Sequence, residues 1–260
     1  MIRAGPSRAS GDSIEPMAQI ATNAQALASL QSAHRACRRC VDAGFIARAH
    51  PVFSGDASQR ILLVGQAPGP VESDAHRPFA GRAGRQLMRW FIRSGFADED
   101  DVRARVYMTS MTTCFPGRRL DGSGDRRPSP HEVALCSSWL DQLLPLLEPA
   151  LILPVGSLAL TRFLPGRTLD EVVGRAYTQS GALLRGAPLK PPLLLPLPHP
   201  SGQSRWLNDA ARAARLEQAL VKLRSLLQWV DETTPPEADS SRWYDWRSSP
   251  RMRIDDARPA

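Results

Sequence analysis

The chain has 260 residues and a formal net charge of +7, and its composition (42% hydrophobic, 23% charged) is typical of a soluble globular protein with a sizeable core. No run approaches the roughly 18 apolar residues of a membrane-spanning helix, and four cysteines are too few for a disulfide scaffold. We therefore expect a cytoplasmic protein without a secretory signal or membrane segment, whose basic charge suits a polyanion such as nucleic acid.

Segments typical of strands and helices alternate along the chain. In chain order, the pattern predicts a helix over residues 17–39, a buried strand over 61–64, a helix over 84–94, a strand over 106–113, a helix from 129 to about 147, a strand over 151–155, a short helix over 158–163, strands near 176–184 and 193–197, and a last helix capped by Asn208 or Asp209. Ser129, Pro130 and Glu132 form the pattern of a capping box at a helix start.

This alternation predicts one α/β domain over residues 17–230, between a disordered N-terminus (1–16) and a disordered tail (231–260). The expected fold class is a three-layer α/β/α arrangement around a central, mostly parallel, four-stranded sheet. A Gly- and Arg-rich loop at residues 117–127 carries Arg118, Arg119, Arg126 and Arg127. This loop either tracks phosphates or is a solvated run of charge.

The first buried strand ends in a loop that is typical of a binding site. Residues 65–69 read GQAPG, and RPFAGRAG follows at 77–84 before a helix begins. In open α/β sheets the ligand crevice lies at the carboxyl ends of the strands, and helix N-termini attract phosphate. Many α/β proteins have such a loop, so its meaning depends on which residues join it.

Three residues could join this loop in a site. His199 follows a buried strand between two prolines and could donate a hydrogen bond to a developing anion, or it could be a turn histidine bonded to local backbone. Phe79 could stack on a planar base or pack in the core. Glu72 could orient a water molecule or be a solvated loop carboxylate.

The four cysteines are Cys37, Cys40, Cys114 and Cys136, of which the first two form a C-x2-C pair in a polar, Arg-rich context. Four thiolates can hold an iron–sulfur cluster or a zinc ion, and the spacing does not choose between them. The alternative is four unrelated buried cysteines, since free cysteine is common in protein cores.

Together these motifs resemble the iron–sulfur uracil-DNA glycosylases, usually called family four. That family's first motif is GEAPGxxED followed by PFxGxAG, its second is ITNxxKCRP, and its third is HPA or HPS. The matching stretches here are GQAPGPVES with RPFAGRAG, MTSMTTCFP, and HPSG at His199. The cysteines fall at the family's four cluster positions, and the resemblance covers about residues 33–224.

The resemblance implies a monofunctional DNA-repair hydrolase that flips uracil out of DNA and cleaves its N-glycosidic bond, leaving an abasic site. By analogy, Phe79 stacks on the uracil, His199 stabilises charge on its O2, and Glu72 orients the water. The resemblance places Gln66 among both the catalytic and the base-binding residues, and it places Ala67 and Ser110 among the base-binding residues. The implied cofactor is a structural 4Fe–4S cluster on the four cysteines, with zinc less favoured.

The resemblance also implies an interface for uracil-containing DNA. Its expected residues are Arg82, Arg85, Ser201, Gln203, Arg205 and Trp206, where the segment after His199 would press into the gap left in the duplex. We expect a monomer that works on the bacterial nucleoid.

Three positions depart from the family pattern. Gln66 replaces a Glu, Ser110 replaces the Asn that reads uracil, and SGQSRWLN at residues 201–208 replaces a leucine-containing loop. Because Ser has one hydroxyl where Asn pairs with two groups, two alternatives stay open. One is a glycosylase for another deaminated base, such as hypoxanthine or xanthine, and the other is a non-catalytic module that binds lesions.

Overall fold

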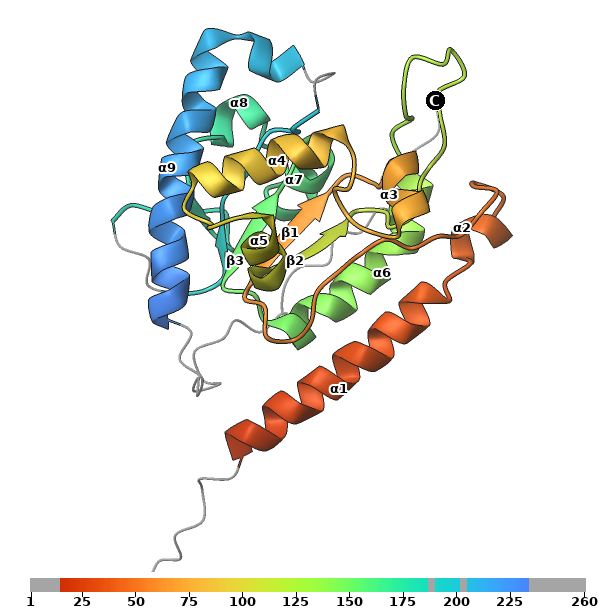
Figure 1. Cartoon of the computed structure of the whole chain (residues 1–260), viewed down its shortest axis with the longest axis horizontal. Coiled ribbons are helices and arrows are strands. Elements are labelled where there is room, and N and C mark those ends of the chain that lie inside the picture. The colour runs from red at the N-terminus through yellow and green to blue at the C-terminus, as the bar shows by residue number, and fades with distance from the viewer. Residues whose placement is uncertain (1–14, 187–189, 202–204, 234–260) are drawn as a thin grey trace, which may run out of the picture.

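The computed structural model describes residues 15–186, 190–201 and 205–233, and the predicted disorder at the two termini lies largely outside these ranges. Within them the chain forms an α/β fold around one sheet (Figure 1). Helix α1 (Glu15–Arg35) begins inside the predicted N-terminal segment, and α9 (Ala210–Thr233) runs past the predicted boundary at residue 230. No helix in the described part of the chain is long and apolar enough to cross a membrane.

The central sheet is mostly parallel, as expected, but it has five strands instead of four. Its order is β2-β1-β3-β5-β4, and only β4 runs antiparallel. The bounds are β1 Ile61–Gly65, β2 Val106–Ser110, β3 Leu151–Pro154, β4 Tyr177–Thr178 and β5 Leu193–Leu194. The five strands correspond to the five strand segments that the sequence pattern predicts, so the expected count of four was one too low. The predicted strand at 176–184 folds back at Gly181, which has a positive φ of 82°. Only its first arm pairs with β5.

Both outer edges of the sheet are closed by single bridges. Ser54 pairs with Met108 beside β2, and the Val52 N–H donates to the Thr113 carbonyl. At the other edge, Leu183 pairs back onto Tyr177 of β4. Neither covering segment extends into a further regular strand in the described residues.

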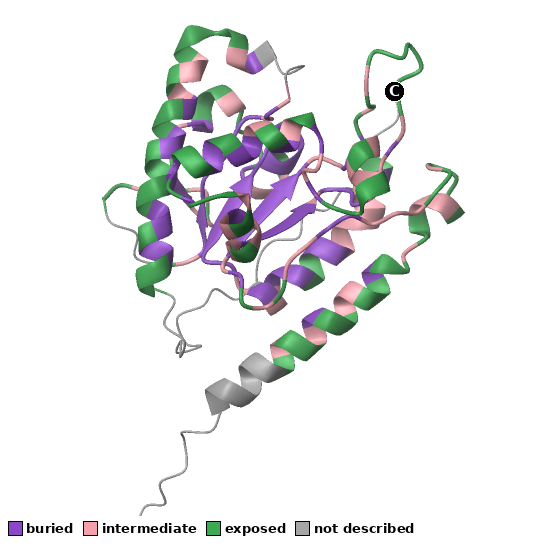
Figure 2. Ribbon diagram, viewed as in Figure 1, coloured by how far each residue is buried: buried purple, intermediate pink, exposed green. Residues whose placement is uncertain are grey.

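The strands are buried on both faces because helices cover each side (Figures 1 and 2). Alternate side chains of β1 enter two cores. Ile61 and Leu63 pack with α4 (Arg82–Arg93), α5 (Glu99–Arg105) and α9, whereas Leu62 and Val64 pack with α1, α6 (Pro130–Leu147) and α7 (Ser157–Phe163). This period of two is the reason that a continuous apolar run forms a central strand. The predicted three-layer arrangement is present.

The helices agree with the expected ones in part. The predicted ones are α4 Arg82–Arg93, α6 Pro130–Leu147, α7 Ser157–Phe163 and α9. The capping box of α6 is confirmed, with the Ser129 N–H donating to Glu132 Oε2 and the Glu132 N–H donating to Ser129 Oγ. Asp209 caps α9, since its Oδ1 accepts from the Arg212 N–H.

Several boundaries were wrong. The helix predicted over residues 17–39 is two helices, α1 and α2 (Arg39–Asp42), and Cys37 lies between them. Strand β2 ends at Ser110 instead of residue 113, because the Ser110 hydroxyl donates to the Thr112 carbonyl and turns the chain. Three helices were missed, namely α3 Pro70–Ala75, α5 Glu99–Arg105 and α8 Leu169–Val172.

Candidate active-site cleft and cysteine site

A cleft with a volume of about 420 Å³ opens at the carboxyl ends of β1, β2 and β3. Seven of the predicted site residues line it: Gln66, Ala67, Glu72, Phe79, Ser110, His199 and Ser201. Gln66 follows β1, Ser110 ends β2, and His199 follows β5. Parallel strands place these positions at one edge of the sheet, so residues far apart in the sequence share one site.

Glu72, on the missed helix α3, ties two loops of the cleft together. Its Oε1 accepts a hydrogen bond of 2.7 Å from the Gly81 N–H, and its Oε2 accepts one of 3.1 Å from the Gly69 N–H. The carboxylate thus joins the GQAPG loop to the start of α4. Each oxygen keeps a further lone pair, which can accept from a water molecule in the cleft.

Phe79 is held in a left-handed backbone conformation with a φ of 54°. A Cβ at Gly65 would lie 3.2 Å from its ring, so the ring sits against the end of β1. A Cβ at Gly84 would lie only 1.7 Å from the Phe79 carbonyl oxygen, which explains the glycine there. The half-buried ring forms one wall of the cleft.

His199 is oriented by its own loop. The Ser201 N–H donates to Nδ1 at 3.2 Å, so the neutral ring carries its proton on Nε2. Burial lowers the pKa of His199, and the charge of Glu72 offsets part of this shift. The side chain packs on Gly156, where a Cβ would lie 3.5 Å away. His199 is therefore a neutral donor at the cleft.

The Ser110 hydroxyl already donates a hydrogen bond within the protein. Its Oγ donates to the Thr112 carbonyl at 2.8 Å. The hydroxyl can therefore face a ligand in the cleft only as an acceptor. Ala67 lies beside it on the loop after β1, and the Gln66 carbonyl accepts from the Thr112 N–H.

The residues predicted to bind DNA lie in different environments. Arg82 and Arg85 are exposed on α4, and Ser201 lines the cleft. Gln203 lies outside the described residues, and only the backbone of Arg205 is described. Trp206 is 9% exposed, and its Nε1–H donates to Asp170 Oδ1 at 3.0 Å. This indole packs in the core, which does not suit the surface wedge that we expected.

The basic loop is also divided. Arg126 does not face solvent freely, because both its terminal nitrogens bind the carboxylate of Glu132, which is 2% exposed. Arg118, Arg119 and Arg127 are exposed. No sequence pattern points to Asp125, which lines the cleft next to Gly69. Burial raises the pKa of Asp125, and the charge of Glu72 adds to this shift while Arg118 opposes it.

The four cysteines line one small cavity between α2, the segment after β2, and α6. Burial raises the pKa of Cys40 to about 11 and that of Cys114 to about 12, and it also raises the pKa of Cys136. Such thiols ionise readily only when a cation compensates their charge. Among the described residues, no three His, Cys, Asp or Glu side chains are placed to hold a single metal ion. The donor set and its shared cavity fit a cluster of several irons.

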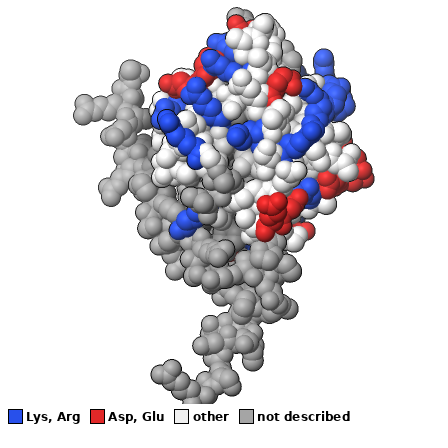
Figure 3. Space-filling model, turned by 90° about the vertical axis from the view of Figure 1, so that its left-hand side faces the viewer, with Lys and Arg blue, Asp and Glu red and all other residues white. Residues whose placement is uncertain are grey.

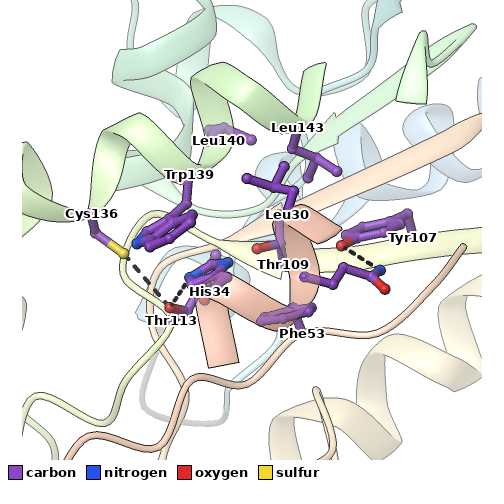
Figure 4. Close-up of a pocket in the computed structure, with 12 residues that line it drawn as sticks. Leu30, His34, Phe53, Tyr107, Thr109, Thr113, Cys136, Trp139, Leu140 and Leu143 are labelled. Carbon is purple, nitrogen blue, oxygen red and sulfur yellow. Dashed lines mark hydrogen bonds between the residues drawn. The ribbon is translucent and has the colours of Figure 1, made fainter. Parts of the chain in front are cut away.

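A layer of aromatic side chains lies next to Cys136 (Figure 4). His34 is stacked between Phe53 and Trp139, with ring centroids 4.6 Å and 4.4 Å away. Its Nε2 lies 2.8 Å from Thr113 Oγ1, which in turn lies 3.7 Å from Cys136 Sγ. Burial lowers the pKa of His34 to about 4, helped by Arg39 and Arg35, so the ring is neutral at pH 7.

Comparison with known proteins identifies relatives over most of this fold. A family model described as the uracil DNA glycosylase superfamily matches residues 52–224. The type-4 uracil-DNA glycosylase of Thermotoga maritima is 30% identical over 179 residues, which cover 68% of this chain and 82% of that protein. The type-4 enzyme of Archaeoglobus fulgidus is 30% identical over 128 residues, covering 47% of this chain and 59% of that one. The type-5 uracil-DNA glycosylase of Pyrobaculum aerophilum is 31% identical over 143 residues, covering 51% and 60%.

Proposed function

The chain belongs to the uracil-DNA glycosylase superfamily and is a DNA-repair hydrolase, and from that premise we propose how its own residues excise a base. The proposed reaction is hydrolysis of the N-glycosidic bond of uracil in DNA, leaving an abasic site. The observation that carries this proposal is the meeting of Gln66, Phe79, Ser110 and His199 at one cleft. A base inside a duplex cannot reach such a cleft, so the nucleotide must be flipped out of the stack.

In the proposed mechanism His199 stabilises the departing base. Its Nε2–H donates to uracil O2 as the bond from N1 to the sugar C1′ breaks and negative charge develops on the base. Because Nδ1 already accepts from the Ser201 N–H, the donor points the same way before and during the reaction. A neutral donor stabilises the anion without binding the ground state tightly.

Phe79 and Glu72 complete the site. The ring of Phe79 stacks on the flipped base, and the remaining lone pairs of Glu72 orient a water for attack on C1′. The attacking water loses a proton to solvent as its oxygen bonds to C1′ and the bond from C1′ to N1 breaks, and the uracil anion takes up a proton from solvent after release. The backbone at Gln66 and Ala67 borders the base or the water.

Ser110 supports two candidate substrates. As an acceptor it pairs with an N–H on the edge of the base. Uracil presents such a donor at N3, and hypoxanthine presents one at N1. We therefore keep hypoxanthine, and by the same logic xanthine, as the second candidate substrate.

We also propose that Cys37, Cys40, Cys114 and Cys136 hold a 4Fe–4S cluster. When bound, this group supplies a structural link and no step of base excision, because four thiolates fill its ligand positions. The support is the cavity that all four cysteines share. Analysis of the purified protein should find iron and inorganic sulfide, and stoichiometric zinc with a colourless protein would contradict this assignment.

The proposed DNA interface begins at α4. Arg82, Arg85 and Arg89 are exposed at positions that share one side of the helix, and Arg82 lies next to the cleft. Lys and Arg side chains also gather in the upper part of the molecular face that α9 crosses (Figure 3). Such charge favours phosphate contacts that are independent of sequence. Action as a monomer on the bacterial nucleoid, in the cytoplasm, belongs to the same proposal.

The test is alkaline cleavage of end-labelled oligonucleotides that carry one uracil, either single-stranded or opposite guanine or adenine. We expect a strand break at the uracil that His199→Ala reduces by at least about a hundredfold, the usual scale for one oxyanion donor. Parallel oligonucleotides carry hypoxanthine or xanthine. Excision of hypoxanthine without uracil would replace the proposed substrate. No excision with retained DNA binding would favour a lesion-binding module.

A further inference from the structure

The contacts behind the cysteine site form a chain of hydrogen bonds that the proposed reaction does not use. Thr113 Oγ1 lies between His34 Nε2, at 2.8 Å, and Cys136 Sγ, at 3.7 Å (Figure 4). The Thr113 backbone N–H also donates to the Cys136 sulfur. One residue therefore makes two contacts to one sulfur, and a third contact ties its hydroxyl to a distant helix.

The direction of these hydrogen bonds follows from the donors available. A thiolate has no proton, so the hydroxyl of Thr113 must donate to it. A hydroxyl has only one proton, and thus His34 must donate to Thr113 Oγ1 from Nε2. The order is His34 to Thr113 to Cys136, and each group in it is a donor to the next.

His34 is fixed by its surroundings. Its ring lies nearly parallel to Trp139, at 7°, and to Phe53, at 17°, and it is 7% exposed. Between two aromatic faces the imidazole can neither turn its edge nor leave without breaking both stacks. The hydroxyl of Thr113 is consequently held toward the sulfur before any metal centre forms.

We infer that His34 and Thr113 are positioning residues that donate a hydrogen bond to the sulfur of Cys136 and so stabilise the more reduced state of the cluster and slow its loss. This inference rests on the cluster of the proposed function. Hydrogen bonds to ligand sulfurs are a recognised means by which proteins set the potential of iron–sulfur centres. Added negative charge on reduction strengthens such a bond, which raises the reduction potential.

The neighbouring residue offers a matched control. Thr112 also lines the cysteine cavity, and its Oγ1 is buried without a hydrogen-bond partner. Thr113→Val and Thr112→Val make the same change of hydroxyl to methyl one residue apart. Only the first removes a contact to sulfur. Thr113→Ser restores the hydroxyl, and His34→Phe keeps an aromatic ring in the stack but lacks the donor.

The experiment measures the reduction potential of the cluster by spectroelectrochemistry, and its rate of loss to an iron chelator, in the intact protein. We expect a more negative potential and about tenfold faster loss in Thr113→Val, as for the removal of one hydrogen bond to a charged group. His34→Phe should shift both in the same direction, whereas Thr112→Val and Thr113→Ser should match the wild type.

Two failures can be told apart. If the wild type holds iron and sulfide but Thr113→Val behaves like Thr112→Val, the hydrogen-bond relay is wrong and the cluster stands. If the wild type holds neither iron nor sulfide, the proposed cluster itself is wrong, and the relay falls with it. Should Thr113→Val fail to fold, the comparison of His34→Phe with Thr112→Val decides the question on the same two readouts.

Discussion

At the scale of single residues, the cleft differs from a generic base pocket in how its polar groups are already engaged. The Ser110 hydroxyl donates a hydrogen bond to the Thr112 carbonyl, and His199 Nδ1 accepts one from the Ser201 N–H. In the proposed reaction the base edge therefore meets one acceptor and one donor, whose directions are fixed by hydrogen bonds to the backbone. Such fixed groups need little reorganisation when charge develops on the base.

For Ser110 we expect an effect on catalysis that a second serine in the cleft lining does not share. Ser110→Ala should lower kcat/KM for the preferred base by about tenfold, because an N–H on the base edge loses its acceptor. Ser157→Ala, at the start of α7 in the lining of the same cleft, is the control. Steady-state kinetics on oligonucleotides with a single lesion measure both. Equal effects would remove Ser110 from base recognition.

The pH dependence of the reaction should report the depressed pKa of His199. Its ordinary pKa is 6.5, and burial lowers the value in the folded protein. The neutral donor therefore persists as the pH falls through 6.5, and kcat/KM should stay level there and decline only below it. Once Nδ1 is protonated, it becomes a donor that faces the Ser201 N–H, and the hydrogen bond between them is lost. A decline centred at 6.5 or above would contradict this assignment, and His199→Gln should remove the acid limb.

At the scale of elements, α3 and Glu72 form the join between two loops. Glu72→Gln replaces one acceptor oxygen by a donor, so one of the N–H groups of Gly69 and Gly81 loses its partner. We expect a loss of about 1–3 kcal/mol in the free energy of unfolding, measured by urea denaturation, together with lower activity. Asp74→Asn, exposed on the same helix, should change neither. Lower activity at unchanged stability would confine Glu72 to water orientation.

The same elements show how far the sequence could predict the site. The strands could be predicted from apolar runs bounded by glycines and prolines, because these signals are local. The assignment of Gln66, Phe79 and His199 to one site came from the resemblance to the family-four motifs. The helix at Glu72 was missed, since Gly69 and Pro70 are also typical of a loop. Trp206 was expected at the surface but packs in the core, and its indole N–H bonds to Asp170 on α8, contacts that the local sequence does not indicate. Nothing local to Asp125 indicates that its loop folds back to the cleft.

At the scale of the whole molecule, the positive charge should act through phosphates. Replacing Arg82 and Arg85 by Gln should weaken binding to all DNA sequences alike. The slope of the logarithm of affinity against the logarithm of salt concentration should fall by about one per arginine that contacts a phosphate. Arg93→Gln is the control on the same helix, because Arg93 is paired with Glu217. Titrations at several salt concentrations measure the slopes, and equal slopes for all variants would exclude α4 from the interface.

The bridges at the two edges of the sheet affect how this protein can pair with other chains. Ser54 occupies the outer side of β2, and Leu183 folds back on β4, so in the described residues each border strand has a covering segment. An extended peptide, or a second unfolding copy, consequently lacks a free run of N–H and C=O groups to extend the sheet, and templated strand addition is disfavoured. Such a molecule should tolerate high concentration with little tendency to polymerise, while its loops at the strand ends stay open for a ligand.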